Sequence, residues 1–139
     1  MARRARRRLE YLPAAVGDLK RLQQDDPTLA AEAGRILSDV AAGRRDGEPL
    51  SAMAATGDLS DCRKIYFGHR NEPTHRIVLQ LRPDGTIEVV LVVAVESRAD
   101  AYVYLLSAER LQRLPALQQP HLDRLRQQRI AKRGRGQGR

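Results

Sequence analysis

The segment from residue 76 to residue 95 constrains the fold of this chain more than any other part of it. Residues 89–95 form an unbroken run of seven apolar residues, which is too short for a membrane span of roughly 18–20 residues. Alternating and β-branched residues predict strands over 76–82 and 86–95. The sequence Pro-Asp-Gly at 83–85 favours a tight turn, because proline presets φ and glycine accepts a positive φ. An antiparallel hairpin is therefore predicted here.

Helical and strand patterns flank this hairpin. Apolar residues recur at helical spacing in two segments near the N-terminus, and Asp26 is placed to cap the second of them. Residues 44–61 contain glycine and proline and are predicted to be a connecting loop. The remaining predicted elements, in chain order, are a strand at 8–12, helices from Pro13 and from Asp26 to Gly43, a strand at 63–67, and a helix at 100–114 that stops before Pro115. This order predicts an α+β fold.

Alternation along the predicted strands assigns side chains to two faces of the sheet. The face that packs against the helices is predicted to carry Ile87, Val89, Leu91, Val93 and Val95. The other face is predicted to be free of helices and to carry Lys64, Tyr66, Arg76 and Arg98, together with an apolar strip of Val78, Val90, Val92 and Ala94. Because monomers rarely leave such a strip in water, a partner chain is expected to cover it.

The positive charge lies at the two ends of the chain. There are 25 Lys+Arg against 17 Asp+Glu, a net charge of +8. Residues 1–10 carry +4 and residues 111–139 carry +7, so the stretch between them carries −3. Basic ends bind DNA or RNA through counterion release, although solvated tails have the same composition. We expect one domain over 1–114, including a basic arm at 1–7, and a basic, largely disordered extension at 115–139. A short helix within 116–131 stays open, because Leu122 and Leu125 lie three residues apart.

The single cysteine, Cys62, restricts the covalent and metal chemistry. It cannot form an internal disulfide and cannot alone build a zinc site. The basic start of the chain lacks the apolar core of a secretory signal. We therefore expect a cytoplasmic protein without a membrane span, a metal or another cofactor.

Four short motifs resemble those of the RelE/ParE toxin superfamily of bacterial type II toxin–antitoxin systems. They are GDLSDCRKIY at 57–66, HRIV at 75–78, SRAD at 97–100, and Val-Tyr at 103–104. The resemblance covers roughly residues 8–112. It implies a RelE-like βααβββα fold, with an antiparallel-dominated sheet and helices packed on one face. It also implies a cognate antitoxin as partner, in a hetero-oligomer.

Within the RelE branch, the resemblance implies a ribosome-dependent mRNA endonuclease that inhibits translation and needs no metal. The branch's catalytic positions fall on Lys64, Arg76, Arg98 and Tyr104, and Tyr66 stands where the branch has a second lysine. In this chemistry a 2′-hydroxyl attacks the adjacent phosphorus, so arginines suit the phosphate oxygens. A Lys64 whose pKa is lowered by neighbouring cations suits a base or a charge stabiliser. Tyr104 suits stacking on a base.

Three further residues, Arg63, His69 and Arg82, are candidates for RNA contacts. Arg63 has the parity of core residues, so a solvated strand charge is the simpler interpretation. Ordinary structural roles are open to the catalytic candidates as well. The two arginines can pair with nearby carboxylates, and Tyr104 can pack against the sheet.

Two other functions are compatible with the same residues. A ParE-like protein shares the fold but inhibits DNA gyrase without nuclease chemistry, and the tyrosine at position 66 favours this alternative. The third is a nucleic-acid-binding module in which the basic ends supply the affinity.

Overall fold

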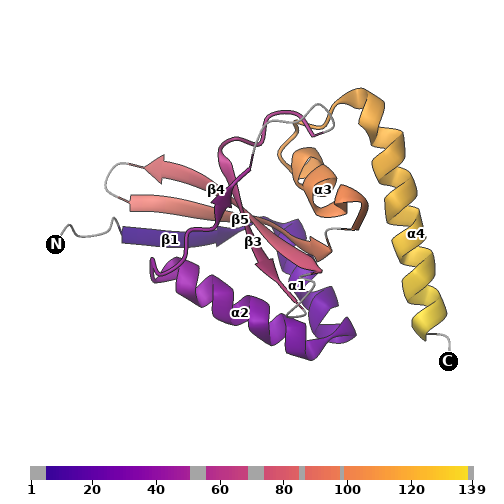
Figure 1. The fold of residues 1–139 in the computed structure, drawn as a ribbon, viewed down its shortest axis with the longest axis horizontal. Helices are drawn as coiled ribbons and strands as arrows, with labels where there is room; N and C mark the ends of the chain where they lie inside the picture. Colours follow the sequence, from indigo (N-terminus) through magenta and orange to yellow (C-terminus); the bar gives the residue numbers. More distant parts are fainter. Residues whose placement is uncertain (1–5, 51–55, 69–73, 85–86, 98, 138–139) are drawn as a thin grey trace.

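The computed structural model describes residues 6–50, 56–68, 74–84, 87–97 and 99–137. Figure 1 shows an α+β fold, as the sequence predicts. Its elements are β1 (Arg6–Tyr11), α1 (Pro13–Asp25), α2 (Pro27–Ala41), β2 (Glu48–Pro49), β3 (Cys62–Phe67), β4 (His75–Asp84), β5 (Ile87–Ser97), α3 (Tyr102–Arg110) and α4 (Gln119–Gln137), with short 3-10 turns at Ala99–Ala101 and Ala116–Gln118.

The strands form one mixed sheet in the order β1-β5-β4-β3-β2. β1 runs parallel to β5, and the other neighbouring pairs are antiparallel. The predicted hairpin is confirmed as β4 and β5, which pair from His75 opposite Ser97 to Asp84 opposite Ile87. The two-residue β2 lies in a segment that we expected to be loop throughout.

The helical hairpin α1–α2 forms where the sequence predicts it. Pro13 begins α1, and the Asp26 side chain caps α2 by accepting a hydrogen bond from the Leu29 backbone N–H at 3.2 Å. The apolar stripes of both helices pack on one face of the sheet. The buried residues of this first core are Ala15, Leu22, Leu29, Ala33, Ile36, Leu37, Val40, Ile65, Phe67, Ile77, Leu79, Val90, Val92 and Val95.

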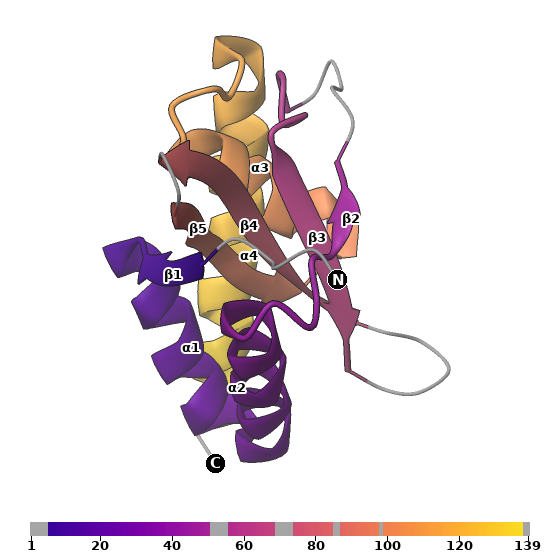
Figure 2. The ribbon, with the colours of Figure 1, turned by 90° about the vertical axis from the view of Figure 1, so that its left-hand side faces the viewer.

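The helix α3 packs on the opposite face, which corrects the expectation that all helices lie on one side (Figures 1 and 2). This second core consists of Leu59, Cys62, Val78, Leu91, Val93, Ala94, Val103 and Ala108. The apolar strip predicted to need a partner chain is therefore divided between the two cores, and its four members are completely buried. The chain's own helices cover it.

A β-bulge in β5 explains why the predicted faces fail in that strand. Val78 pairs with Ala94 and its neighbour Leu79 pairs with Val92, so Val93 is an extra residue on β5. An extra residue reverses the alternation, and therefore every residue before it changes face. The predicted faces are wrong for the part of β5 before the bulge and correct for Ala94 and Val95.

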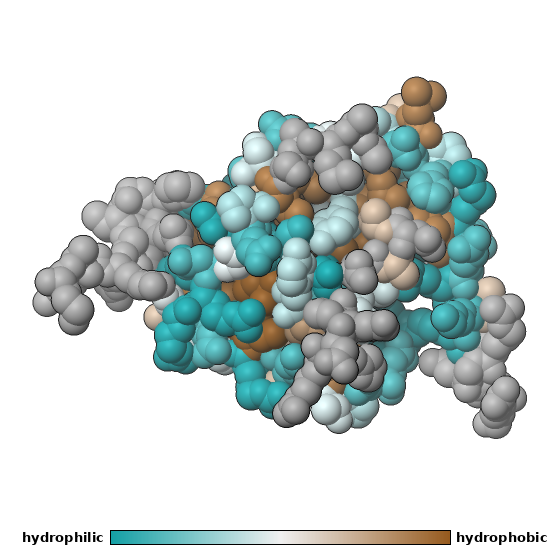
Figure 3. All heavy atoms as spheres, in the orientation of Figure 1, coloured by the Kyte–Doolittle hydropathy of each residue, from teal (hydrophilic) through white to brown (hydrophobic). Residues whose placement is uncertain are grey.

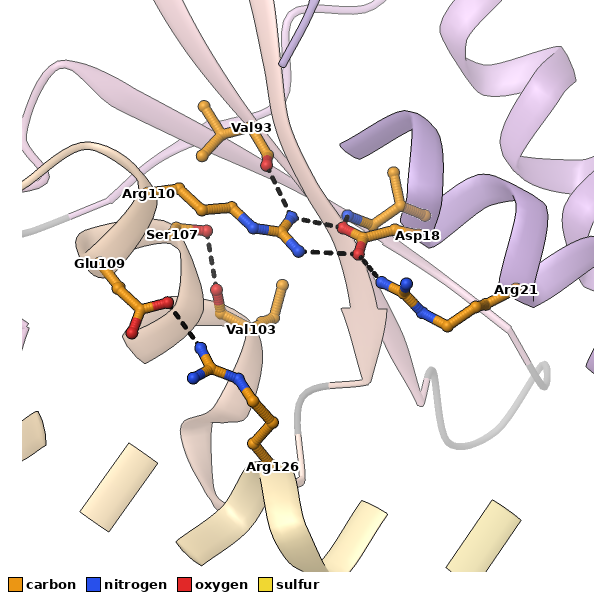
Figure 4. A network of polar contacts seen from close by, with 9 residues as sticks. Asp18, Arg21, Val93, Val103, Ser107, Glu109, Arg110 and Arg126 are labelled. Atoms are coloured by element: carbon orange, nitrogen blue, oxygen red, sulfur yellow. Dashed lines mark hydrogen bonds and ion pairs between the residues drawn. The ribbon is translucent and has the colours of Figure 1, made fainter. Parts of the chain in front are cut away.

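The bulge lies at the point where β1 ends. Beyond that point, no strand among the described residues pairs with this edge of β5. The last main-chain bond from that side joins the Leu12 N–H to the Val92 carbonyl. Beyond it, the Val93 carbonyl accepts from Arg110 Nη1 at 3.0 Å, and the Val95 N–H donates to Asp18 Oδ2 at 2.9 Å (Figure 4). Side chains from α3 and α1 thus satisfy the edge groups that a strand would otherwise pair.

The two side chains that cover this edge also bind each other. Arg110 forms two hydrogen bonds to the Asp18 carboxylate, at 2.6 and 2.9 Å, and Arg21 adds a third at 2.6 Å (Figure 4). Asp18 is 1% exposed. The Asp18–Arg110 pair therefore joins α1, β5 and α3, and it fixes the position of α3 over the sheet.

The segment 119–137 is a helix, α4, where the composition predicts a largely disordered extension. Leu122 and Leu125 pack into a third core with Tyr102, Leu105 and Leu106 of α3. Among the described side chains of α4, Leu122 and Leu125 are the buried leucines of this contact, and polar side chains supply the rest. Gln119 donates to Glu109 at 2.7 Å, and arginines add ion pairs while their stems cover apolar surface. Composition alone does not reveal such a contact.

Within the described residues, no helix combines the length and the apolar character needed to cross a membrane.

Candidate active site

Antiparallel pairing of β3 and β4 places Lys64, Tyr66 and Arg76 on the α3 side of the sheet. Tyr66 and Arg76 are directly opposite in the register, and Lys64 is two residues before Tyr66 on the same face. The Arg76 guanidinium carbon lies 3.8 Å from the centre of the Tyr66 ring, and Lys64 Nζ lies 5.3 Å from it. Two cations therefore flank one phenol, as in a cation–π arrangement.

Arg76 lies on the buried side of the Tyr66 ring. It is 6% exposed, whereas Tyr66 is 38% exposed. Its Nη1 atom donates a hydrogen bond of 2.8 Å to the His75 carbonyl. The positive charge of Arg76 thus acts on the surface mainly through the tyrosine stacked on it.

The ammonium of Lys64 donates a hydrogen bond to Tyr66, and this bond raises the pKa of Lys64 above its ordinary value. Partial burial opposes the shift, while the proximity of Tyr104 and Glu48 adds to it. The predicted lowering of the Lys64 pKa by neighbouring cations is wrong, because the groups that act on the ammonium, Tyr66 first and then Tyr104 and Glu48, raise the pKa. Lys64 is therefore a cation at neutral pH, which suits charge stabilisation rather than proton abstraction.

Tyr104 reaches the same place from α3. Its ring is half-buried against the second core, and it lies close enough to Lys64 to affect the pKa of that lysine. We call Lys64, Tyr66, Arg76 and Tyr104 the candidate cluster. Arg98 and His69, which the sequence also nominates, lie outside the described residues.

Arg63 and Arg82 do not join the candidate cluster. Arg63 is on the opposite side of β3 and donates to the Gly47 carbonyl at 3.1 Å, so it holds the segment before β2. Arg82 is exposed near the far end of β4. Six residues of strand place it about 20 Å from Arg76.

A shallow hollow of about 280 Å³ adjoins the candidate cluster. It is lined by residues 45–48 and by Lys64, Ile65 and Tyr66. Gly47 has φ +77°, and a Cβ atom there would lie 2.8 Å from the Lys64 carbonyl oxygen, so only glycine allows this close approach. The glycine and proline at 47 and 49 are the sequence signals of this contact, although from sequence they predict only a loop.

The buried Asp18 is another residue that sequence analysis missed. Its position falls within the apolar stripe of α1, between Ala15 and Leu22, and both of those residues are buried. A carboxylate in such a stripe is a signal of a buried ion pair, because an unpaired charge there is too costly. Glu96 lies near this pair, and burial, followed by the charge of Asp18, raises its pKa.

No three His, Cys, Asp or Glu side chains among the described residues are grouped so that they could hold a metal ion. Cys62 is buried, and burial raises the pKa of its thiol to about 12, which makes it a packing residue.

No protein-family model and no curated protein matches this chain. Among solved structures, the chain is similar to the free state of an E. coli RelE toxin variant with two arginines replaced by alanine, with a TM-score of 0.51 and 21% identity over 74% of this chain and 95% of that chain. This chain has the RelE fold. A YoeB/ParE toxin from Agrobacterium tumefaciens is also similar, with a TM-score of 0.49 and 17% identity over 65% of this chain and 97% of that chain.

The similarity to RelE confirms the fold that the four sequence motifs imply. The order βααβββα is present, with the short β2 and the terminal α4 in addition. The match leaves about a quarter of this chain outside the RelE fold.

Proposed function

We propose that this protein is the toxin of a type II toxin–antitoxin system and cleaves mRNA on the ribosome without a metal ion. The observation that carries the proposal is the candidate cluster on the α3 side of a RelE-type sheet. Strand register and the placement of α3 bring these four residues together from 40 residues of sequence.

The arrangement suits attack by a 2′-hydroxyl on the neighbouring phosphorus. The new P–O bond gives a 2′,3′-cyclic phosphate, and the 5′-oxygen leaves with a proton. Lys64, as a cation, stabilises the charge that builds on the phosphate oxygens. The Tyr66 hydroxyl, which Lys64 contacts, is placed to relay a proton. Arg76 holds the Tyr66 ring in place, and Tyr104 offers a face on which a base can stack.

The test is mRNA cleavage in a translating extract, followed by primer extension. Lys64→Gln and Tyr66→Phe are suitable variants, because both side chains are partly exposed and should leave the fold intact. Arg35→Gln on α2 is the control, since it removes one exposed cation on the opposite side of the sheet from the candidate cluster. We expect cleavage by the wild type and the control, and strong loss in the two variants. Intact transcripts with the wild type, or full activity in Lys64→Gln, would contradict the proposal.

Inhibition of DNA gyrase is the second candidate function. Two observations favour it: a tyrosine occupies position 66, and Arg76 is buried, so fewer cations face a substrate than the endonuclease chemistry would ideally use. Supercoiling by purified gyrase with added protein separates the two functions. Inhibition of supercoiling without mRNA cleavage would establish the second candidate.

We also propose a cytoplasmic location and neutralisation by a cognate antitoxin. The antitoxin cannot bind the apolar strip of the sheet, because α1, α2 and α3 already bury it. Its binding surface must therefore lie elsewhere on the molecule. Co-expression with a small open reading frame beside the gene tests this: growth should stop with the protein alone and recover with the pair.

A further inference from the structure

The five basic residues of α4 whose side chains the structure describes divide into an anchored set and an outward set. Arg126 pairs with Glu109, Arg133 pairs with Asp25 at 3.1 Å, and the Arg129 guanidinium carbon lies 4.1 Å from the centre of the Tyr102 ring. These contacts bind α4 to α3 and to the end of α1. They hold the helix in place along its length, beyond the two leucines that anchor its first turns.

The outward set is Arg124 and Lys132. Both are exposed, and neither forms an ion pair or hydrogen bond with any described residue. Arg124, Gln128 and Lys132 follow at four-residue spacing, so they lie along one side of the helix. The two cations are eight residues apart, which corresponds to about 12 Å along the axis.

The surface of this part of the molecule is hydrophilic. Figure 3 shows hydrophilic side chains along the described part of α4 at one end of the molecule. The helix sequence contains six basic residues and one acidic residue, Asp123. A helix that is already held in place and presents unneutralised cations favours a polyanion, because its backbone needs no further ordering on binding.

We propose that the outward face of α4 binds the sugar–phosphate backbone of double-helical RNA, as a second RNA contact beside the candidate cluster. The choice of RNA rests on the proposed function. Arg, Lys and Gln are the side chains that donate to phosphate oxygens, and Gln127 and Gln128 are exposed between the two cations. Backbone contacts of this kind position a nucleic acid without reading its sequence.

A protein partner fits this face less well. Protein interfaces depend on aromatic or aliphatic anchors buried at their centre. The one large apolar side chain that is exposed on the described part of α4 is Ile130, at 63%. One isolated isoleucine is too little for such an anchor, so charge and hydrogen bonding must supply the affinity.

The test measures binding to a mixed-sequence RNA duplex of about 20 base pairs. The variant Arg124→Gln/Lys132→Gln removes the outward cations. The control Lys20→Gln/Arg35→Gln removes the same charge from exposed positions on α1 and α2 that have no partner among the described residues. We expect the α4 variant to lose about tenfold in affinity at near-physiological salt, with a log–log salt slope shallower by about two. The control should bind like the wild type.

Three results would overturn the inference: unchanged affinity in the α4 variant, an equal loss in the control, or a preference for a DNA duplex of the same sequence. A loss of antitoxin affinity with RNA affinity unchanged would assign the face to a protein and also overturn it. The proposed function can be overturned independently of this inference. If the wild type cleaves no mRNA while the α4 variant still binds RNA more weakly than the control, the α4 inference stands and the endonuclease proposal falls.

Discussion

In the proposed endonuclease, the charge state of Lys64 decides which role this residue can play. The hydrogen bond to Tyr66 raises the pKa of Lys64 above its ordinary value of 10.5, so the side chain stays protonated as pH rises through the neutral range. We expect Lys64→Gln to lower the rate of mRNA cleavage by about 10²–10³, the usual loss for a charge-stabilising donor. Lys64→Arg should retain much of the activity.

The pH profile distinguishes this role from that of a base. Cleavage that depends on Lys64 should remain level between neutral pH and the ordinary lysine pKa. If instead the cleavage rate rises with an apparent pKa near neutrality, and Lys64→Gln abolishes this rise, the assignment is contradicted. Lys64 would then act as a general base.

The Cys62 thiol provides a probe of the second core. Burial raises its pKa to about 12, and the chain has no other cysteine. We expect the folded protein to resist iodoacetamide in mildly alkaline buffer, because the thiolate is the reactive form and is scarce here. The guanidinium-unfolded protein should react completely, as measured by mass spectrometry. Rapid labelling without unfolding would show that the core under α3 opens readily.

At the scale of elements, the Asp18–Arg110 pair holds α1, β5 and α3 together. Asp18→Ala leaves the buried Arg110 guanidinium without its counter-charge and the Val95 N–H without its acceptor, so we expect it to cost about 3–5 kcal/mol in urea unfolding. Asp39→Ala is the matched control. Its ion pair with Arg44 is exposed, and its loss should cost less than about 1 kcal/mol.

The coupling between the two residues can be measured directly. Asp18→Ala combined with Arg110→Met should cost less than the sum of the two single changes, because the double variant leaves no unpaired charge. Strict additivity would show that the two side chains act independently.

The helix α4 depends on its two buried leucines. Leu122 is completely buried, whereas Leu117, before the helix, is 91% exposed. We expect Leu122→Ala to cost about 2–5 kcal/mol in the docking of α4, and Leu117→Ala to have no effect. Amide hydrogen exchange measures this as faster exchange in α4 alone. Equal protection of α4 in both variants would contradict the packing described here.

For the whole molecule, acid stability depends on Asp61. Hydrogen bonds from Arg113, the largest cause, hold the pKa of Asp61 well below its ordinary value of 3.8. A lowered carboxyl pKa stabilises the folded state above the ordinary value, and this contribution is lost as pH falls through the range below it. We expect the free energy of unfolding to fall as pH drops below about 4, by less than about 1 kcal/mol from this partly exposed pair.

Asp61→Asn removes this titration and should flatten that part of the stability profile. Glu96 affects the pH dependence of stability in the opposite direction. Burial raises its pKa, so its contribution to the free energy of unfolding decreases as pH rises. A profile for Asp61→Asn as steep as that of the wild type would show that other carboxylates control acid unfolding.

The candidate site was partly predictable for a definite reason. β3 and β4 pair without a bulge from Cys62 opposite Gln80 to Phe67 opposite His75, so simple alternation places Lys64, Tyr66 and Arg76 on one face correctly. The same rule fails in the first part of β5, because the extra residue at Val93 reverses it. The alternation of residues along β5 cannot predict this bulge. The main-chain groups beside it bond to Asp18 of α1 and Arg110 of α3, which are far away in the sequence.

By itself, the sequence determined the order of the elements from β1 to α3 apart from β2, the cap at Asp26, the β4–β5 hairpin and the face shared by Lys64, Tyr66 and Arg76. These features depend on side chains within a few residues of one another, where propensity and alternation act. Only the tertiary structure decided that α3 covers the second face, that Arg76 lies beneath Tyr66, and that leucines and arginines together hold α4 in place. Those outcomes depend on contacts such as Asp18 with Arg110, 92 residues apart, which no local pattern encodes.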